Sequence, residues 1–132
     1  MGDTLAIKYK ERGRHILVRW LCSEAINDRA LWNEITRHIN RLFGEKISAQ
    51  IGLHLVLFNS KEAYALLRCS HRNIVHLRAA IAAIHEINCQ NKERKLVLMY
   101  VERVFGTIQR AKRHLKESIQ IQDTKVSNDD KN

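Results

Sequence analysis

Apolar residues recur along the chain with a strand period in some segments and a helix period in others. Residues 14–22 alternate, and both faces of the resulting strand carry apolar side chains. The residues on the two faces are Ile16, Val18 and Trp20, and Leu17, Arg19 and Leu21. Apolar residues on both faces are typical of a central strand that is covered on both sides.

A helical repeat follows this strand. Asn27 or Asp28 can cap the helix, and the repeat runs to about Phe43. Gly44 is a suitable residue to end it. The apolar stripe consists of Leu31, Ile35, Ile39 and Leu42.

A long alternating segment then predicts a strand over residues 49–59. Residues 59–62 form a polar turn, and residues 63–69 are apolar again. Two such segments joined by a short turn predict a β-hairpin.

The remaining elements follow the same reasoning. A second helix begins at Ser70 or Asn73 and continues to about Asn88. After a polar linker, residues 95–103 predict the last strand, and residues 107–120 predict a last helix.

The predicted order is β-α-β-β-α-β-α. Its first six elements match the ferredoxin-like split βαβ arrangement, an α+β fold with two helices on one face of an antiparallel sheet. The seventh element either covers part of the open face or presents its charges outward. We expect a basic lead-in over residues 1–13, a single domain over 14–120 and a disordered tail over 121–132.

The charge of the chain narrows its possible partners. Its 132 residues include 23 Lys and Arg but only 14 Asp and Glu, a formal net charge of +9. Such a surplus favours a polyanion, and nucleic acid is the first candidate. An anionic membrane surface is the alternative, but only the last helix approaches the basic amphipathic character this requires. No apolar run is long enough to span a membrane.

A candidate phosphate-binding corner lies where the last strand meets the last helix. Gly106 turns the chain, and Thr107 can cap the helix, whose free N–H groups favour an anion. The alternative is that Gly106 only makes the turn and the nearby cations are solvated. A second candidate is Ser70-His71-Arg72, although helix capping explains Ser70 more simply. The residues predicted to contact a nucleic-acid backbone are Lys8, Lys10, Arg12, Arg14, Thr107, Arg110, Lys112, Arg113 and Lys116.

No arrangement of residues predicts catalysis or metal binding by this chain. The seven histidines are scattered, and no carboxylates are paired in the manner of a general acid and base. Cys69 and His71 lack a second ligand pair at zinc-like spacing. Cys22, Cys69 and Cys89 are odd in number and widely spaced, which favours reduced thiols.

Aromatic residues are too few on the predicted central strands to favour base stacking, so recognition of the RNA backbone is better supported. Some apolar residues remain after two helices cover one face of the sheet. They lie either in a protein interface or, as we prefer, under the last helix. These residues are Val56, Phe58 and Met99.

Several segments, in order along the chain, resemble the small ferredoxin-like protein subunit of archaeal and eukaryotic ribonuclease P, called protein component 2 in archaea. The resemblance covers about residues 14–116. Family members commonly have Ser where this chain has Phe105, and an aromatic residue where it has His15. The matching segments are residues 14–18, Leu42-Phe43-Gly44, residues 65–69, residues 75–81 and Gly106-Thr107-Ile108 with Arg110-Ala111-Lys112.

The resemblance implies a non-catalytic subunit of an endoribonuclease whose RNA removes the 5′ leader of precursor tRNA. The protein then needs no cofactor, and Mg²⁺ belongs to the catalytic RNA. The implied partners are ribonuclease P RNA, precursor tRNA and a TIM-barrel-like protein subunit, with two copies of each protein in a heterotetramer. The implied location is the cytoplasm for an archaeal source, which the compact length favours, or the nucleus and nucleolus for a eukaryotic one. The alternatives are a generic RNA- or ribosome-associated module, and a small enzyme or ligand-sensing domain for which a charge of +9 has no use.

Overall fold

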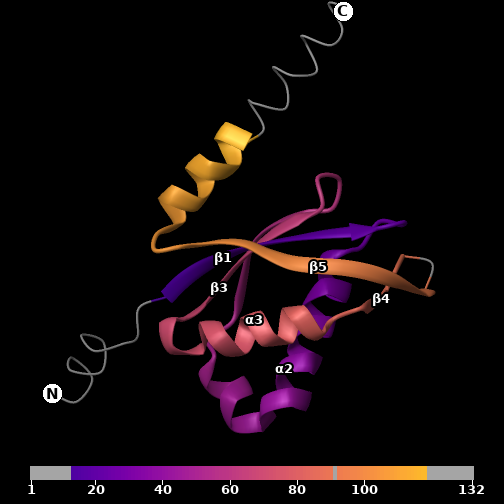
Figure 1. The fold of residues 1–132 in the computed structure, drawn as a ribbon, viewed down its shortest axis with the longest axis horizontal. Helices are drawn as coiled ribbons and strands as arrows, with labels where there is room; N and C mark the ends of the chain where they lie inside the picture. The colour runs from indigo at the N-terminus through magenta and orange to yellow at the C-terminus, as the bar shows by residue number, and fades with distance from the viewer. Residues whose placement is uncertain (1–12, 91, 119–132) are drawn as a thin grey trace, which may run out of the picture.

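The computed structural model describes residues 13–90 and 92–118, drawn in colour in Figure 1. The last described element is a helix over residues 108–118, here called the C-terminal helix. The other elements are β1 (Gly13–Cys22), α2 (Asp28–Gln50), β2 (His54–Asn59), β3 (Tyr64–Ser70), the 3₁₀ turn η1 (His71–Asn73), α3 (Ile74–Ala83), β4 (Glu86–Asn88) and β5 (Arg94–Phe105).

The five strands form one sheet in the order β2-β3-β1-β5-β4, and every neighbouring pair is antiparallel. The order of the four longer strands is that of the ferredoxin-like fold, so the predicted fold class is confirmed. Figure 1 shows α2 and α3 together on one side of the sheet and the C-terminal helix on the other. The strand β4 is an addition at the edge of the sheet.

The main core lies between the sheet and the two helices α2 and α3. The even-numbered residues of β1 point into it, because successive side chains of a strand face opposite sides. Its fully buried members include Ile16, Val18, Leu31, Ile35, Leu67, Leu77 and Ile81.

A second, smaller core lies on the opposite face of the sheet. Leu17, Leu66 and Phe105 pack there against Ala111 and Leu115 of the C-terminal helix. Of the two roles considered for this helix, covering part of the open face is therefore correct, and its outer side remains exposed.

A β-bulge in β5 positions the second core. Leu17 pairs with Arg103 but Val18 pairs with Val101, so Glu102 is an extra residue on β5. A bulge of this kind sets two residues opposite one and changes which face the following residues occupy. Beyond it, Phe105 shares the face of Leu17, and the chain enters the C-terminal helix on that side.

The predicted boundary between the first helix and the next strand is wrong. Gly44 does interrupt the helix, with φ 85° and ψ 178°, but helical structure resumes and continues to Gln50. Ile51 is buried in the main core, and its N–H donates to the carbonyl of Ile47 at 2.9 Å. Gly52 then turns the chain with φ 59°, and β2 begins five residues later than predicted. At the start of α2 the cap is confirmed, since the Asn27 side chain accepts from the Ala30 N–H at 2.7 Å.

The end of the second helix is also wrong. The helix α3 ends at Ala83, and the next residues form β4 instead of a final helical turn. Ile87 pairs with Lys95 in the sheet, and its side chain is fully buried. Burial of this apolar side chain stabilises the extended backbone over the helical one.

Parts of the sequence predictions lie outside the described residues: the lead-in with Lys8, Lys10 and Arg12, the last residues of the predicted helix, and the tail over 121–132. Among the described helices, none is long and apolar enough to cross a membrane.

Candidate RNA interface

The C-terminal helix is amphipathic in the described structure. Its side toward the sheet carries Ala111 and Leu115, both buried, and the partly buried Ile108. Its outer side is exposed and mostly basic, with Glu117 as an exposed acid of the same helix. The exposed cations are Arg110, Lys112, Arg113 and Lys116. Helical periodicity thus separates an attachment face from a charged face.

These four cations are not neutralised within the protein. None of them forms an ion pair with a carboxylate of residues 13–90 or 92–118. The nearest acid on β5, Glu102, is occupied by Arg19 at 2.9 Å and by His114 at 3.4 Å. The positive charge of the outer side is therefore available to an external anion.

The start of the C-terminal helix is built as predicted. Thr107 Oγ1 accepts from the N–H of Arg110 at 3.2 Å, so the hydroxyl caps the first turn. Gly106 has open space around its Cα on the side where a Cβ would point. The Thr107 hydroxyl is therefore engaged in capping the first turn of the helix.

Arg14 does not join this basic surface. It pairs with Cys69 across β1 and β3, and Cys69 lies in the main core on the side of α2 and α3. Because antiparallel cross-strand partners share a face, Arg14 points away from the C-terminal helix. Of the predicted contact residues that the structure describes, those at residues 107–116 lie together on one helix and Arg14 lies apart from them.

The uncovered half of the open face is apolar. Leu96 and Leu98 of β5 are 74% and 60% exposed, Leu21 of β1 is 64% exposed, and Tyr100 is 41% exposed. Leu21 and Leu98 are direct cross-strand neighbours, so these side chains form one continuous patch. We call Leu21, Leu96, Leu98 and Tyr100 the open-face patch. A large exposed apolar patch is typical of an interaction surface.

The residues chosen from the sequence for this role were a different set. Val56 packs in the second core near the C-terminal helix, as we preferred. Phe58 and Met99 instead face the main core, where the Phe58 ring stacks on Trp20 at a centroid distance of 5.6 Å. Strand alternation alone would have found the open-face patch, since Leu96 and Leu98 alternate with the buried Val97 and Met99.

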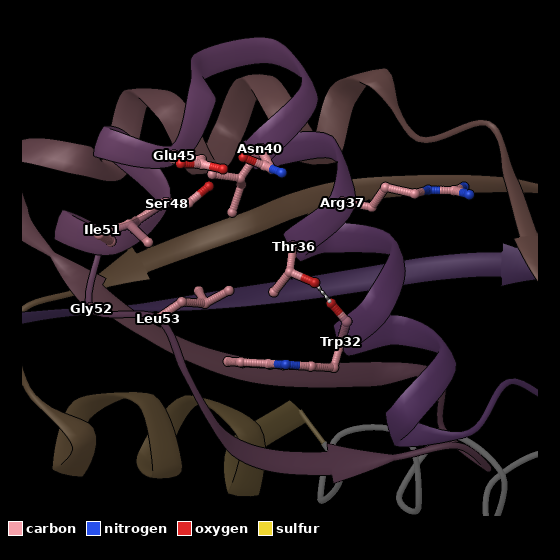
Figure 2. A pocket seen from close by; sticks show the side chains of 11 residues that line it. Trp32, Thr36, Arg37, Asn40, Glu45, Ser48, Ile51, Gly52 and Leu53 are labelled. Atoms are coloured by element: carbon pink, nitrogen blue, oxygen red, sulfur yellow. Dashed lines mark hydrogen bonds between the residues drawn. The ribbon is translucent and has the colours of Figure 1, made fainter.

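A pocket lies at the interruption of α2 and has a volume of about 740 Å³ (Figure 2). Trp32 and Leu53 form its apolar floor, and the Thr36 hydroxyl donates to the Trp32 carbonyl at 2.9 Å. Arg37 and Glu45 bring opposite charges to its rim. Its mixed charge does not favour a phosphate backbone.

Cys22, Cys69 and Cys89 form no disulfide in the described structure. Burial raises the pKa of the Cys69 thiol to about 11, which keeps it protonated and unreactive. Within the described part of the chain, no three His, Cys, Asp or Glu residues gather as a metal site would require.

Comparison with known proteins agrees with this picture. Residues 14–116 match the model of the Rpp14/Pop5 family. The chain belongs to this family. The matched segment starts in β1 and ends at the exposed Lys116, so the C-terminal helix is part of the family's domain. A search of curated protein sequences gave no match.

Nine chains of solved structures are similar to this chain. One of them is a chain in the cryo-EM structure of yeast ribonuclease MRP, with a TM-score of 0.57 and 8% sequence identity. The alignment covers 89% of this chain and 95% of that chain. At this identity the match shows a shared fold over almost the whole of both proteins.

Proposed function

We propose that this chain is a non-catalytic protein subunit of a ribonucleoprotein of the ribonuclease P and MRP type, and that it binds the RNA with its C-terminal helix. Membership of the Rpp14/Pop5 family supports the assignment. The similar fold of a chain in the structure of yeast ribonuclease MRP supports it further.

The observation that carries the proposal is the division of the C-terminal helix into an attached face and a free basic face. Leu115 and Ala111 fix the helix to the sheet, and Arg110, Lys112, Arg113 and Lys116 remain exposed without partners in the described structure. A rigidly held row of cations suits a phosphate backbone, whose neutralisation releases counterions. In this role the RNA performs the cleavage of the precursor-tRNA leader and holds the Mg²⁺ ions.

A protein partner is the second part of the proposal. The open-face patch is apolar and lies on the part of the sheet that the C-terminal helix leaves uncovered. We assign it to a protein neighbour in the complex, a TIM-barrel-like subunit or a second copy of this chain. Such a neighbour would remove four large apolar side chains from water.

The test is purification of the tagged full chain from an extract of its source cells, with sequencing of the bound RNA and identification of the bound proteins. We expect enrichment of ribonuclease P or MRP RNA together with a TIM-barrel-like protein. Recovery of mixed RNA without that protein would instead indicate a generic RNA-binding module. Recovery of no RNA would contradict both functions.

A further inference from the structure

A second basic site lies at the corner where β3 leads into α3 and α2 leads into β2. A pocket of about 590 Å³ opens there, between the first residues of β1 and β2, the end of β3 and the start of α3. The backbone is tied together beneath it, since the Ser70 N–H donates to the Ile51 carbonyl at 2.8 Å. The pocket is thus a fixed feature of the sheet corner.

The side chains of this pocket are cationic or neutral. Arg68 and Arg72 line it together with the imidazoles of His54 and His76, and no Asp or Glu is among its lining residues. His54 and Arg68 are cross-strand partners, so their side chains lie next to each other on the open face. A concave site with this composition concentrates positive potential.

Arg68 is held in place but has no internal counterion. Its guanidinium lies so close to Gly13 that a Cβ there would overlap it, and only glycine allows this approach. Within residues 13–90 and 92–118, Arg68 forms no ion pair with a carboxylate. The other cross-strand neighbour of Arg68 is the buried His15. Burial lowers the pKa of His15, and the positive charge of Arg68 lowers it further.

One polar atom at the α3 side of the pocket, Nδ1 of His76, has no hydrogen-bond partner in the described structure. Ser70 does not cap the helix as the sequence suggested; its hydroxyl accepts from Asn73 Nδ2 at 2.6 Å. His76 is fixed by an edge contact with Phe43 at a centroid distance of 4.6 Å, yet its buried Nδ1 has no hydrogen-bond partner in the described structure. An unpaired buried polar atom in a native protein calls for a ligand or a specific role.

We propose that this corner pocket binds a phosphate group, with Arg68 as its principal ligand and His54 and His76 as supporting donors. Guanidinium groups match phosphate oxygens with two parallel hydrogen bonds, and imidazoles add single donors. In an RNA-binding subunit the phosphate is a backbone phosphodiester. The binding chemistry itself does not depend on the proposed function, because free inorganic phosphate presents the same oxygens.

The pocket is separate from the C-terminal helix, but two of its side chains, His54 and Arg68, lie on the same face of the sheet as that helix. His54, Arg68, His15 and Phe105 pair in one row across the four strands β2, β3, β1 and β5. Phe105 directly precedes the start of the C-terminal helix. With strands about 4.8 Å apart, Arg68 lies about 10 Å from Phe105. A single RNA strand can therefore contact both basic sites.

The test follows the imidazole C–H signals of His54 and His76 by NMR in the full chain at constant ionic strength. The probes are inorganic phosphate, a short single-stranded RNA and sodium acetate. We expect saturable shifts with phosphate or RNA, and about tenfold weaker binding in Arg68→Gln, as for loss of a charge-assisted hydrogen bond. Arg78→Ala is the matched control, since it removes an exposed α3 cation outside the pocket. His54→Ala is a second variant, in which binding is followed through the imidazole C–H signals of His76.

Each result decides the question. Saturation with both phosphate and RNA supports a general phosphate site, and saturation with RNA alone supports a phosphodiester site. An equal response to acetate, or no saturation with phosphate or RNA, overturns the proposal. Equal weakening by Arg78→Ala and Arg68→Gln also overturns it, because long-range charge would then explain the binding. Phosphate binding is also measured in the variant that replaces Arg110, Lys112 and Arg113 with Ala. If the pocket still binds phosphate there, this site stands independently of the proposed RNA-binding function of the helix.

Discussion

Arg94 Nη2 donates to Oε1 of Glu34 at 3.1 Å, across a separation of 60 residues. Glu34 is buried in the middle of α2, with only 4% of its surface exposed. The same guanidinium reaches the Glu86 carboxylate at 3.4 Å and the Asn88 side chain at 3.1 Å. The hydrogen bond with Glu34 raises the pKa of Arg94. This one side chain therefore connects α2, β4 and β5.

Replacing Arg94 with Ala should destabilise the fold, because it removes a partner of a buried carboxylate. We expect the free energy of unfolding in urea to fall by about 1–3 kcal/mol. Arg37→Ala is the control: Arg37 contacts the same Glu34 with a side chain 54% exposed, against 38% for Arg94. It does not share the Arg94 contacts with Glu86 and Asn88. An exposed pair contributes about 0–1 kcal/mol. Equal losses in the two variants would contradict this ranking.

Replacing Arg110, Lys112 and Arg113 together with Ala should weaken RNA binding and flatten its dependence on salt. Each lost phosphate contact lowers the slope of log K against log salt by about 0.7 to 0.9, so the triple variant should lose about 2 to 3. The control is Arg29→Ala, Arg41→Ala and Arg78→Ala in one chain, which removes the same charge from exposed positions on α2 and α3. A slope that changes equally in both variants would indicate a response to net charge alone.

Leu115→Ala should release the C-terminal helix from the sheet. Leu115 is only 5% exposed in the second core, and truncation of a buried leucine costs about 2–5 kcal/mol. We expect faster amide hydrogen exchange over residues 108–118, with the main core unaffected. Lys116→Ala, one residue away but exposed, should change stability by less than about 0.5 kcal/mol. Uniform exchange in both variants would show that the helix is held by something else.

Leu98→Lys should disrupt protein association without unfolding the chain. Leu98 is 60% exposed, so a charge there remains solvated in the isolated protein, but it would be buried in a complex through the open-face patch. The measurement is recovery of the protein partner with the tagged chain. Leu42→Lys tests an exposed leucine outside the patch, 49% exposed, and should leave recovery unchanged. Full recovery with Leu98→Lys would place the partner elsewhere.

The neighbours His15 and Arg68 should make stability depend on pH. Burial and the Arg68 charge lower the pKa of His15 in the folded state, so the unfolded chain takes up a proton first as the pH falls below about 6.5. The free energy of unfolding should therefore fall from pH 6.5 down to the folded pKa and then level off. Arg68→Gln should raise the folded pKa of His15, measured by NMR titration, and reduce the fall. An unchanged pKa would mean that burial alone lowers it.

The sequence located the four longer strands of the sheet because their apolar residues alternate, but it assigned the residues of β4 to a helix. It misplaced the start of β2 because residues 45–50 fit either a strand or a helical turn, and only the burial of Ile51 in the main core distinguishes them. The predicted end of α3 is wrong for a similar reason. Ile84 continues the helical spacing of Ile81, whereas the buried Ile87 requires a strand.

The two basic sites also differ in how far the local sequence predicts them. The helical period separates Arg110 and Arg113 from Ala111 and Leu115, so the basic face of the C-terminal helix follows from local sequence. The corner pocket depends on the pairing of His54 with Arg68, and strand register is a property of the whole fold. The bulge at Glu102, which brings Phe105 to the open face, has no local sequence signal for the same reason.

The partial cover that the C-terminal helix gives to the sheet has a consequence for assembly. At its inner border, Glu102 pairs with both Arg19 and His114, and beyond this polar line the open-face patch begins. Two ligands of opposite chemistry can therefore occupy adjoining areas without competing for the same side chains. We expect their binding free energies to be nearly additive, with little coupling between the two events. A subunit built in this way can enter its complex by either route, through the RNA first or through the protein first.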